Sequence, residues 1–363
     1  MRIKYLLFLQ MMLICTICQS QKNDVAVLAY YTGGEDVDSF AIEKLTHIIF
    51  SFCHLKGNEL NVDNARDTAM IKRLVALKKR SPHLKIMLAL GGWGGCATCS
   101  DVFSTKTDRR EFARSVKEIN NYFGTDGLDL DWEYPAISGY PDHPFNLNDK
   151  YNFTALVKKV RKKLGTKNEL SFAAGGFKSF IETSIEWKKV MKKVNRVNLM
   201  TYDLVSGFST VTGHHTALYS TTQNPESVDN AVRLLQKQGV ANNKIVIGAA
   251  FYGRMWEAVE DSSAGLYRHG KFKATIASKN FESILSPDSG FISHWDSTAQ
   301  AAYSYNPAKK LFVTYDDKRS VGLKTKYVID KGLGGIMFWQ LLDDAYNNGL
   351  LKAIDAVKYG YKK

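Results

Sequence analysis

The chain has 363 residues, 45% of them hydrophobic and 23% charged, and its formal net charge is +13. This composition excludes a disordered chain, which lacks the apolar residues for a core, and the length allows one large domain or two ordinary ones. The excess of basic residues raises the question of a nucleic-acid partner. However, the cations gather in segments such as 157–164 and 187–194, where apolar residues recur at helical spacing. This pattern indicates solvated helix faces, so we expect no nucleic-acid binding.

The first residues have the order of a secretory signal peptide. Two basic residues precede an apolar run, and small or polar residues follow it. The run is shorter than the roughly 20 residues that a membrane span requires. We therefore expect residues 1–20 to be removed, residues 21–363 to form the mature catalytic domain, and the protein to be secreted, with no membrane span. Lipid attachment at Cys15 or Cys18 is less favoured, because small residues do not precede either cysteine.

Eight short apolar segments recur along the rest of the chain, with helix-like stretches between most of them. These segments are 25–31, 46–52, 85–92, 127–132, 170–176, 196–202, 244–253 and 334–340. Eight alternating β/α units in one chain predict an α/β fold with a closed parallel (β/α)8 TIM barrel. An open doubly wound sheet is the alternative, but no G-x-G-x-x-G turn follows the first segment.

The connection between the seventh and eighth predicted strands is too long for a bare loop. It runs for roughly 60 residues and contains strand-like pieces at 291–307 and 309–317. A structureless loop of that length is uncommon in a compact domain. We expect a small α+β subdomain, at about residues 256–315, inserted between strand 7 and helix 7 beside the substrate-binding rim.

Three carboxylates alternate along the fourth predicted strand. They are Asp129, Asp131 and Glu133 in "DGLDLDWEYP". A strand alternates its faces with period two, so all three acids should project from one side. Desolvation and mutual repulsion make this arrangement costly, and proteins accept it mainly where unequal pKa values are needed. The pattern therefore indicates acid–base chemistry.

Aromatic residues and acids dominate the carboxyl ends of the predicted strands, where barrel enzymes have their active sites. Aromatic rings stack on sugar rings and carboxylates act on the acetal bond, so this composition favours a glycosidase. A metal centre would need ligands from several strands, but only Asp203 adds a carboxylate at these ends and no histidine lies there. We expect neither a metal nor a cofactor.

The acid motif resembles the D-x-x-D-x-D-x-E motif of glycoside hydrolase family 18, the chitinase family. Further matches cover nearly the whole mature chain and lie on the corresponding strands. They are "YYTGG", "THIIFSF", "LALGGWGG", "MTYDL", "FYGRMW", "YDD" and "GGIMFWQ".

The resemblance implies a secreted chitinase that hydrolyses β-1,4-N-acetylglucosamine linkages of chitin and chito-oligosaccharides with retention, by a substrate-assisted mechanism. Glu133 would donate the proton to the glycosidic oxygen. Asp131 would orient the acetamido group of the substrate and share a proton with Asp129. The hydroxyl of Tyr202 would hold the acetamido oxygen, so these four residues form the implied catalytic set.

The resemblance also implies a set of substrate-binding residues. Trp339 would form the floor of the subsite where the sugar distorts. The other members would line that subsite or contact neighbouring sugars: Tyr30, Phe52, Gly91, Gly92, Trp93, Gly94, Tyr134, Met200, Asp203, Tyr252 and Arg254.

Two positions depart from the family pattern. Ala89 stands where many relatives have serine, so a hydrogen bond to the acids would come from elsewhere or be absent. Phe208 stands where tryptophan is frequent, which would weaken stacking on the product side.

Three cysteines remain after removal of the leader. In an oxidising compartment Cys96 and Cys99 can close a short disulfide, and we expect Cys53, in an apolar strand, to be buried and free. A zinc site at Cys96 and Cys99 would need further ligands, and none lies near them in the sequence.

Two alternatives remain on the same fold: a chitin-binding lectin without activity, and an endo-β-N-acetylglucosaminidase that acts on N-glycans. Lectin-like relatives typically lack the catalytic glutamate, whereas Glu133 is present here. The predicted insertion and the aromatic residues favour chitin over an N-glycan. We expect chitin or a chito-oligosaccharide as the only partner of a monomeric protein.

Overall fold

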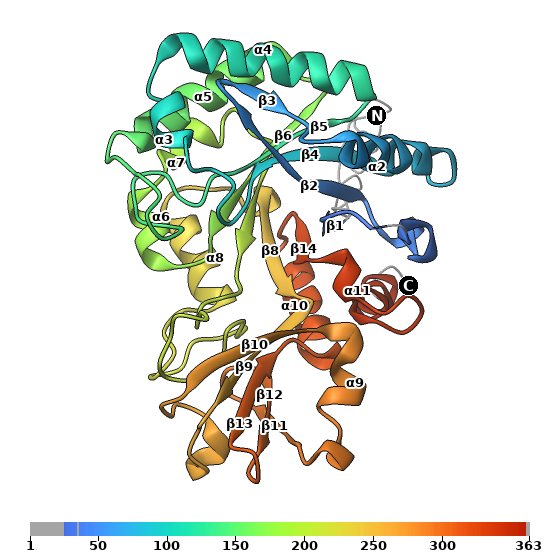
Figure 1. Cartoon of the computed structure of the whole chain (residues 1–363), viewed down its shortest axis with the longest axis vertical. Helices are drawn as coiled ribbons and strands as arrows, with labels where there is room; N and C mark the ends of the chain where they lie inside the picture. The colour runs from blue at the N-terminus through green and yellow to red at the C-terminus, as the bar shows by residue number, and fades with distance from the viewer. Residues whose placement is uncertain (1–24, 35, 361–363) are drawn as a thin grey trace, which may run out of the picture.

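Eight parallel strands close into a barrel in the computed structural model, which describes residues 25–34 and 36–360 (Figure 1). The pairing of the first two strands, with Tyr30 opposite Ile49, closes the ring. Around the barrel the order is β1 (Ala26–Tyr31), β14 (Gly335–Trp339), β8 (Ile245–Ala250), β7 (Arg196–Met200), β6 (Glu169–Gly175), β5 (Gly127–Asp131), β4 (Lys85–Gly91) and β2 (His47–Lys56). The predicted (β/α)8 barrel is confirmed, and the predicted signal peptide lies outside the described residues.

Helices cover the outside of the barrel. The longer ones are α2 (Ala65–Ala76), α4 (Lys106–Phe123), α5 (Asp149–Leu164), α8 (Val228–Lys237), α10 (Lys318–Asp330) and α11 (Leu350–Gly360), and the shorter ones are α3 (Cys99–Val102), α6 (Lys178–Thr183), α7 (Trp187–Val190) and α9 (Phe281–Ile284). Side chains of Asn64, Thr105, Ser227 and Asp317 cap the amino ends of four of them. None of the helices within residues 25–34 and 36–360 combines the length and apolar character that crossing a bilayer requires.

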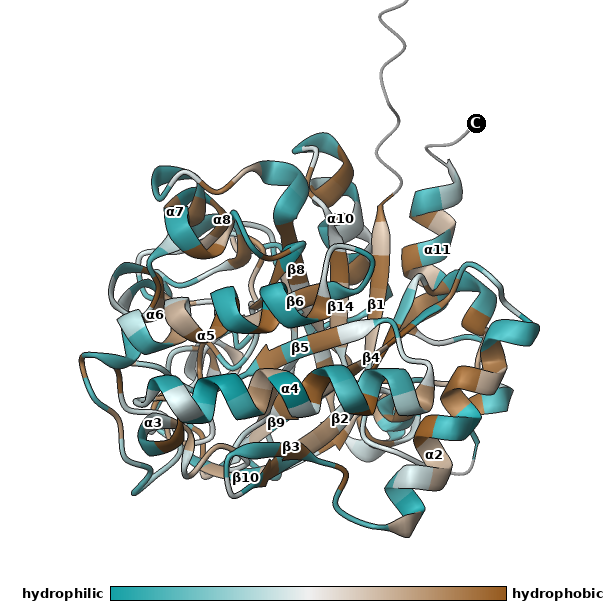
Figure 2. Cartoon of the chain, turned by 90° about the horizontal axis from the view of Figure 1, so that it is seen from above, coloured by the Kyte–Doolittle hydropathy of each residue, from teal (hydrophilic) through white to brown (hydrophobic). Residues whose placement is uncertain are grey.

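The strands form two apolar layers because parallel strands are covered on both faces. Outward-facing residues such as Leu128 and Leu130 pack under the helices, and inward-facing residues such as Ile49 and Met87 fill the barrel. In Figure 2 the barrel strands are mostly hydrophobic, whereas the visible side of α4 is mostly hydrophilic.

A separate antiparallel sheet is inserted after β8. Its order is β10 (Lys271–Ala277), β9 (Tyr252–Glu257), β13 (Leu311–Tyr315), β12 (Ala301–Asn306) and β11 (Ile292–Asp296), and it lies below the barrel in Figure 1. A short strand, β3 (Glu59–Asn61), forms a hairpin with β2. The insertion lies between the seventh barrel strand and α10, the helix that follows it in the β/α alternation.

The predicted seventh strand, 244–253, proved to be two strands in different sheets. The barrel strand β8 ends at Ala250, and Tyr252 begins β9. Phe251, between them, is buried and stacks on Phe338, with ring centroids 3.9 Å apart, and its N–H donates to the carbonyl of Trp339. The apolar run contains no turn residue at this point, so the sequence did not reveal the change of sheet.

A buried ion pair joins the end of the insertion to the barrel. Lys324 on α10 and Asp316, just after β13, have side chains that are 0% and 1% exposed, and their N–O distance is 2.6 Å. Lys324 also donates to the hydroxyl of Thr216 at 2.6 Å, and Thr216 donates to the carbonyl of Thr201 at 3.0 Å. Asp316 in turn accepts from the N–H of Ala250. The pair therefore ties together α10, the end of β8 and the residue next to Tyr202.

A second buried polar cluster closes the amino end of the barrel. Arg196 donates to Nε2 of His47 at 2.8 Å and forms an ion pair with Glu169 at 2.6 Å. Lys85 also contacts Glu169. Burial lowers the pKa of His47, and the charge of Arg196 adds to that effect, while hydrogen bonding to Glu169 opposes it. Burial therefore favours the uncharged form of His47, whose Nε2 lies between Arg196 and Glu169.

Candidate active site

The acids of β5 point into the barrel. Leu128 and Leu130 belong to the outer layer, whereas Asp129 and Asp131, which alternate with them, face the interior. The strand ends at Asp131, so Glu133 lies in the turn beyond it rather than on the strand. The intervening Trp132 is buried on the outer side against Phe103 and Phe153.

Asp129 is fully buried, and both of its oxygens accept hydrogen bonds. Tyr30 donates to Oδ2 at 2.8 Å, and Ser171 and Asn198 donate to Oδ1. Burial raises the pKa of Asp129 to about 6, although these donors oppose the rise. Ala89 provides no donor, and the hydrogen bonds come instead from β1, β6 and β7.

Asp131 is 3% exposed, and its Oδ1 has no hydrogen-bond partner within the described chain. Burial raises the pKa of Asp131 well above its usual value, and the nearby charges of Glu133 and Asp129 add to the rise. An unpaired oxygen in a buried carboxylate is costly unless a ligand or a proton satisfies it.

Glu133 is partly buried at the cleft. Burial raises its pKa to about 7; the hydrogen bond from Tyr134 lowers it, and the charge of Asp203 raises it. Because Asp131 and Glu133 titrate as a pair with raised pKa values, the pair keeps a proton near neutral pH.

A cleft of about 720 Å³ opens above these acids. Its lining is mainly aromatic. It comprises Tyr30, Phe52, Trp93, Asp131, Glu133, Tyr134, Phe177, Met200, Tyr202, Asp203, Ser206, Gly207, Phe208, Tyr252, Arg254, Phe272, Thr275, Trp339 and Asp343.

Trp339, at the end of β14, is part of an aromatic group in this cleft. Its ring stacks on Phe52, with centroids 5.6 Å apart and planes 17° apart, and it lies 6.0 Å from the ring of Tyr30. Phe52 and Tyr30 come from β2 and β1, so three strand ends contribute to one apolar surface. Such a surface suits the C–H face of a sugar ring.

An ion pair links the barrel to the insertion at the cleft. Arg254 on β9 binds both oxygens of Asp203, each at 2.6 Å, and His215 Nδ1 lies 3.6 Å from Asp203. Burial opposes ionisation of Asp203, but the nearby His215 ring and the two hydrogen bonds from Arg254 outweigh it and hold the pKa of Asp203 below its usual value. Asp203 is therefore a fixed negative charge beside Glu133.

Comparison with known proteins identifies the family. A family model described as glycosyl hydrolases family 18 matches residues 26–344. The chain belongs to glycoside hydrolase family 18.

The regions that match this chain make up different shares of its relatives in family 18. Chitinase A1 of Niallia circulans is 33% identical over 298 residues, which are 76% of this chain and 42% of that protein. Chitotriosidase-1 of Mus musculus is 29% identical over 324 residues, which are 82% and 67%. A solved family 18 N-acetylglucosaminidase from Paenibacillus barengoltzii matches with a TM-score of 0.84 and 33% identity, over 92% of this chain and 99% of that one. The chain thus spans less than half of chitinase A1.

Most residues that the family 18 motifs predicted for the site line the cleft, but four do not. Asp129 lies beneath it, and Gly91, Gly92 and Gly94 are absent from its lining. A Cβ on Gly91 would lie 2.1 Å from the carbonyl oxygen of Asp131, and one on Gly92 would lie 2.3 Å from the ring of Phe52. These glycines therefore allow close packing beneath the cleft, and a sugar contact by them stays a prediction.

Six lining residues of this family 18 site were not predicted. They are Phe177, Ser206, Gly207, Phe272, Thr275 and Asp343. Phe272 and Thr275 lie on β10, so the insertion supplies part of the cleft wall, in keeping with its expected place beside the substrate-binding rim, although these two residues were not predicted individually. Burial raises the pKa of Asp343 to about 6, with Lys279 opposing the rise.

Exposed aromatic rings form the rim. Trp93 is 49% exposed and Phe208 is 71% exposed, and their ring centroids lie 6.4 Å apart. The ring of Tyr140 also packs against Trp93, edge to face, with centroids 5.5 Å apart. Phe208 therefore contributes a ring to the rim where tryptophan is frequent in the family.

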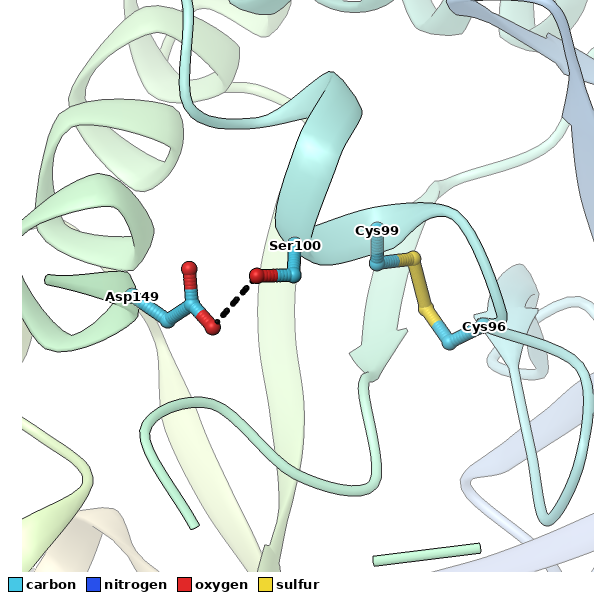
Figure 3. Close-up of a disulfide and its surroundings, with 4 residues drawn as sticks. All are labelled: Cys96, Cys99, Ser100 and Asp149. Atoms are coloured by element: carbon cyan, nitrogen blue, oxygen red, sulfur yellow. Dashed lines mark hydrogen bonds between the residues drawn. A yellow bond between two sulfur atoms is a disulfide. The ribbon is translucent and has the colours of Figure 1, made fainter. Parts of the chain in front are cut away.

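A disulfide joins Cys96, three residues after Trp93, to Cys99 (Figure 3). The hydroxyl of the adjacent Ser100 donates to buried Asp149 at the start of α5, at 2.8 Å. Cys53 is free and buried. Nowhere in residues 25–34 and 36–360 do three or more His, Cys, Asp or Glu side chains gather in a way that could hold a metal ion.

Proposed function

We propose that the protein is a secreted, monomeric chitinase that cleaves β-1,4-N-acetylglucosamine linkages with retention of configuration, assisted by the acetamido group of the substrate. The observation that carries this proposal is the position of Glu133, at the cleft and beside a carboxylate that has an unpartnered oxygen.

In the first step, Glu133 gives its proton to the glycosidic oxygen as the bond from that oxygen to the anomeric carbon breaks. The acetamido carbonyl oxygen of the same sugar forms a bond to the anomeric carbon, which gives an oxazolinium ion. Glu133, now ionised, takes a proton from water as the water opens this ring. The raised pKa of Glu133, about 7, supports the proton-donor role.

Asp131 and Tyr202 would hold the acetamido group. The free Oδ1 of Asp131 can accept the acetamido N–H, which would satisfy its missing hydrogen bond. Among the residues that the structure describes, the hydroxyl of Tyr202 has a hydrogen bond only to the sulfur of Met337, at 3.8 Å, so it can donate to the acetamido oxygen. Both contacts would strengthen as charge develops on that group. Trp339 would support the ring of the sugar.

The lectin alternative is less favoured because a binding protein does not need a proton donor beside two buried carboxylates. The N-glycan alternative would use the same acids. The aromatic rim of Trp93, Tyr140 and Phe208 supports a linear chain of sugars, since successive rings can stack along it.

The variant Glu133→Gln tests the proton-donor role. The amide keeps the shape of the side chain but has no proton to transfer, so turnover of chito-oligosaccharides should fall by at least about 10²-fold while binding is retained. Glu118→Gln, on the exposed face of α4, is the control and should leave turnover unchanged. A Glu133→Gln variant within about tenfold of wild type would disprove the assignment.

A thiazoline analogue of N-acetylglucosamine tests the intermediate. It mimics the oxazolinium ring and should inhibit competitively, because Asp131 and Tyr202 would hold it. Trapping of a glycosyl ester on a protein carboxylate would contradict substrate assistance. In a turnover assay without inhibitor, kcat/KM should fall as the pH rises through about 7, because Glu133 then loses the proton that it must donate.

A further inference from the structure

Two basic segments that are distant in sequence lie side by side in the fold. They are 157–164 at the end of α5 and 187–194, which contains α7. The guanidinium of Arg161 donates to the carbonyl of Lys193 at 2.6 Å and to the side chain of Asn195 at 2.5 Å. In both Figure 1 and Figure 2 the two helices lie on the same side of the barrel.

Together these segments form an exposed surface, which we call the basic face. Lys188 on α7 lies beside Gly239, two residues past the end of α8, so the face extends to that helix. Its exposed members are Lys158, Lys162, Lys163, Lys167, Lys188, Lys192, Lys193 and Lys237.

Acidic residues are largely missing from the basic face. Residues 150–168 and 187–202 contain no aspartate or glutamate. Lys189 does pair with Glu186, but no lysine of the basic face forms an ion pair with any residue that the structure describes. On α4, by contrast, Arg114 pairs with three glutamates.

This contrast separates the basic face from an ordinary solvated helix face, where charges of both signs alternate and stabilise one another. Eight like charges on one surface repel one another and destabilise the folded state. Beneath the face, burial lowers the pKa of Lys244, and the charge of Arg161 lowers it further. An anionic partner would relieve this repulsion.

The basic face lies at the amino ends of the barrel strands β6, β7 and β8. Lys167 lies two residues before β6, Lys193 lies three residues before β7, and Lys244, which precedes β8, donates to carbonyls at the end of the α7 segment. The cleft lies at the opposite, carboxyl ends of the strands. A partner bound at the basic face would therefore leave the cleft open.

We propose that the basic face is a docking surface for an acidic polysaccharide, one that carries sulfate or carboxylate groups. Binding at this surface does not depend on the glycosidase reaction, so one of the two proposals can be wrong while the other holds. Tethering to such a polymer would raise the local concentration of the enzyme near neighbouring glycan chains.

The chemistry of the surface favours an acidic polysaccharide over other polyanions. Segments 155–168 and 185–196 contain no exposed large hydrophobic side chain. A membrane-binding surface needs apolar residues to enter the bilayer, and single-stranded nucleic acid is usually bound by stacking of its bases on aromatic rings. Flexible lysines suit sulfate or carboxylate groups spaced along a hydrated polymer.

The test measures binding of fluorescent heparin, a sulfated polysaccharide, to the full-length protein. The buffer contains roughly 50 mM NaCl, because salt at this low concentration screens charge–charge contacts only weakly. The test variant is Lys162→Glu/Lys163→Glu/Lys192→Glu/Lys193→Glu. The matched control is Lys271→Glu/Lys273→Glu/Lys309→Glu/Lys310→Glu, which changes the net charge equally on exposed residues of the insertion.

Wild-type protein should bind heparin, and binding should weaken steeply with salt. The basic-face variant should bind at least about tenfold more weakly, and the control less than about twofold more weakly, since only local charges displace counterions from the polymer. Turnover of a soluble chito-oligosaccharide should be unchanged in both, which also shows that they are folded. If the charge-reversed protein does not fold, the Lys→Gln version of the same four changes is measured against the matching control.

Three results would overturn the proposal. The first is no heparin binding by wild-type protein. The second is an equal loss in the two variants, which would assign binding to net charge alone. The third is tighter binding of phosphatidylserine vesicles or of duplex DNA than of heparin under the same conditions.

Discussion

Replacing Lys324 with methionine removes the cation from its buried ion pair with Asp316, where the insertion rejoins the barrel. Methionine keeps most of the aliphatic stem, so the main change is that Asp316 loses its positive partner. Both side chains are almost inaccessible to solvent. Leaving one charge of a buried pair without its partner typically costs about 3–5 kcal/mol, and we expect a loss in the free energy of unfolding of this size.

The same helix offers a matched control. Lys326 pairs with Asp330 at 2.6 Å, but these side chains are 51% and 45% exposed. Solvent screens such a pair, so Lys326→Met should change the free energy of unfolding by about 0.5 kcal/mol or less. Adding Asp316→Asn to Lys324→Met should recover part of the loss, because the uncompensated charge is then gone.

The assay is urea unfolding followed by tryptophan fluorescence, together with kcat on a chito-oligosaccharide. Lys324 is connected through Thr216 to the carbonyl of Thr201, which precedes Tyr202, so kcat should also fall in Lys324→Met. A loss of stability below about 1 kcal/mol would refute the reasoning, since that is the scale of an exposed pair. So would equal effects of Lys324→Met and Lys326→Met.

Three further outcomes are expected. His47 has a lowered pKa in the folded protein, so below about pH 6.5 the unfolded chain binds a proton at this residue more readily; between pH 7 and pH 5 the Tm of wild-type protein should therefore change less favourably than that of His47→Gln, and the same pH dependence in both would contradict this. Replacement of residues 258–312 by a Gly/Ser linker should lower kcat/KM on hexamers more than on dimer-releasing chromogenic substrates; equal losses with unchanged circular dichroism would show that the insertion is not a substrate wall. Thiol titration of denatured, unreduced mature protein should find one free thiol, Cys53, and three free thiols would rule out the Cys96–Cys99 bridge.

The barrel could be predicted from sequence because its strands are buried on both faces and therefore appear as continuous apolar runs. The same property hid the end of β8: Phe251 is as apolar as its neighbours, and only its stacking on Phe338 reveals that the chain changes sheets there. Local sequence does not specify such a tertiary contact.

The sequence itself contains a signal for two of the hydrogen-bond partners of Asp129. Ser171 and Asn198 are single polar residues within otherwise apolar runs, and a buried polar side chain needs a partner. By contrast, Phe272 and Thr275 reach the cleft only because β10 pairs with β9. Their contribution depends on how two sheets meet, which residue spacing does not encode.

The insertion leaves and rejoins the barrel at nearly the same point. The N–H of Ala250, the last residue of β8, donates to Asp316, and Gly253 on β9 pairs with Tyr315 on β13, the first and last strands of the insertion along the chain. Because the two junctions are adjacent, the chain between them can lengthen, shorten or be exchanged without a change in the register of the barrel strands. The acids on β5 then stay in place while one wall of the cleft is rebuilt. Specificity for different glycans can therefore evolve by exchange of the inserted segment, without a change in the residues that cleave the bond.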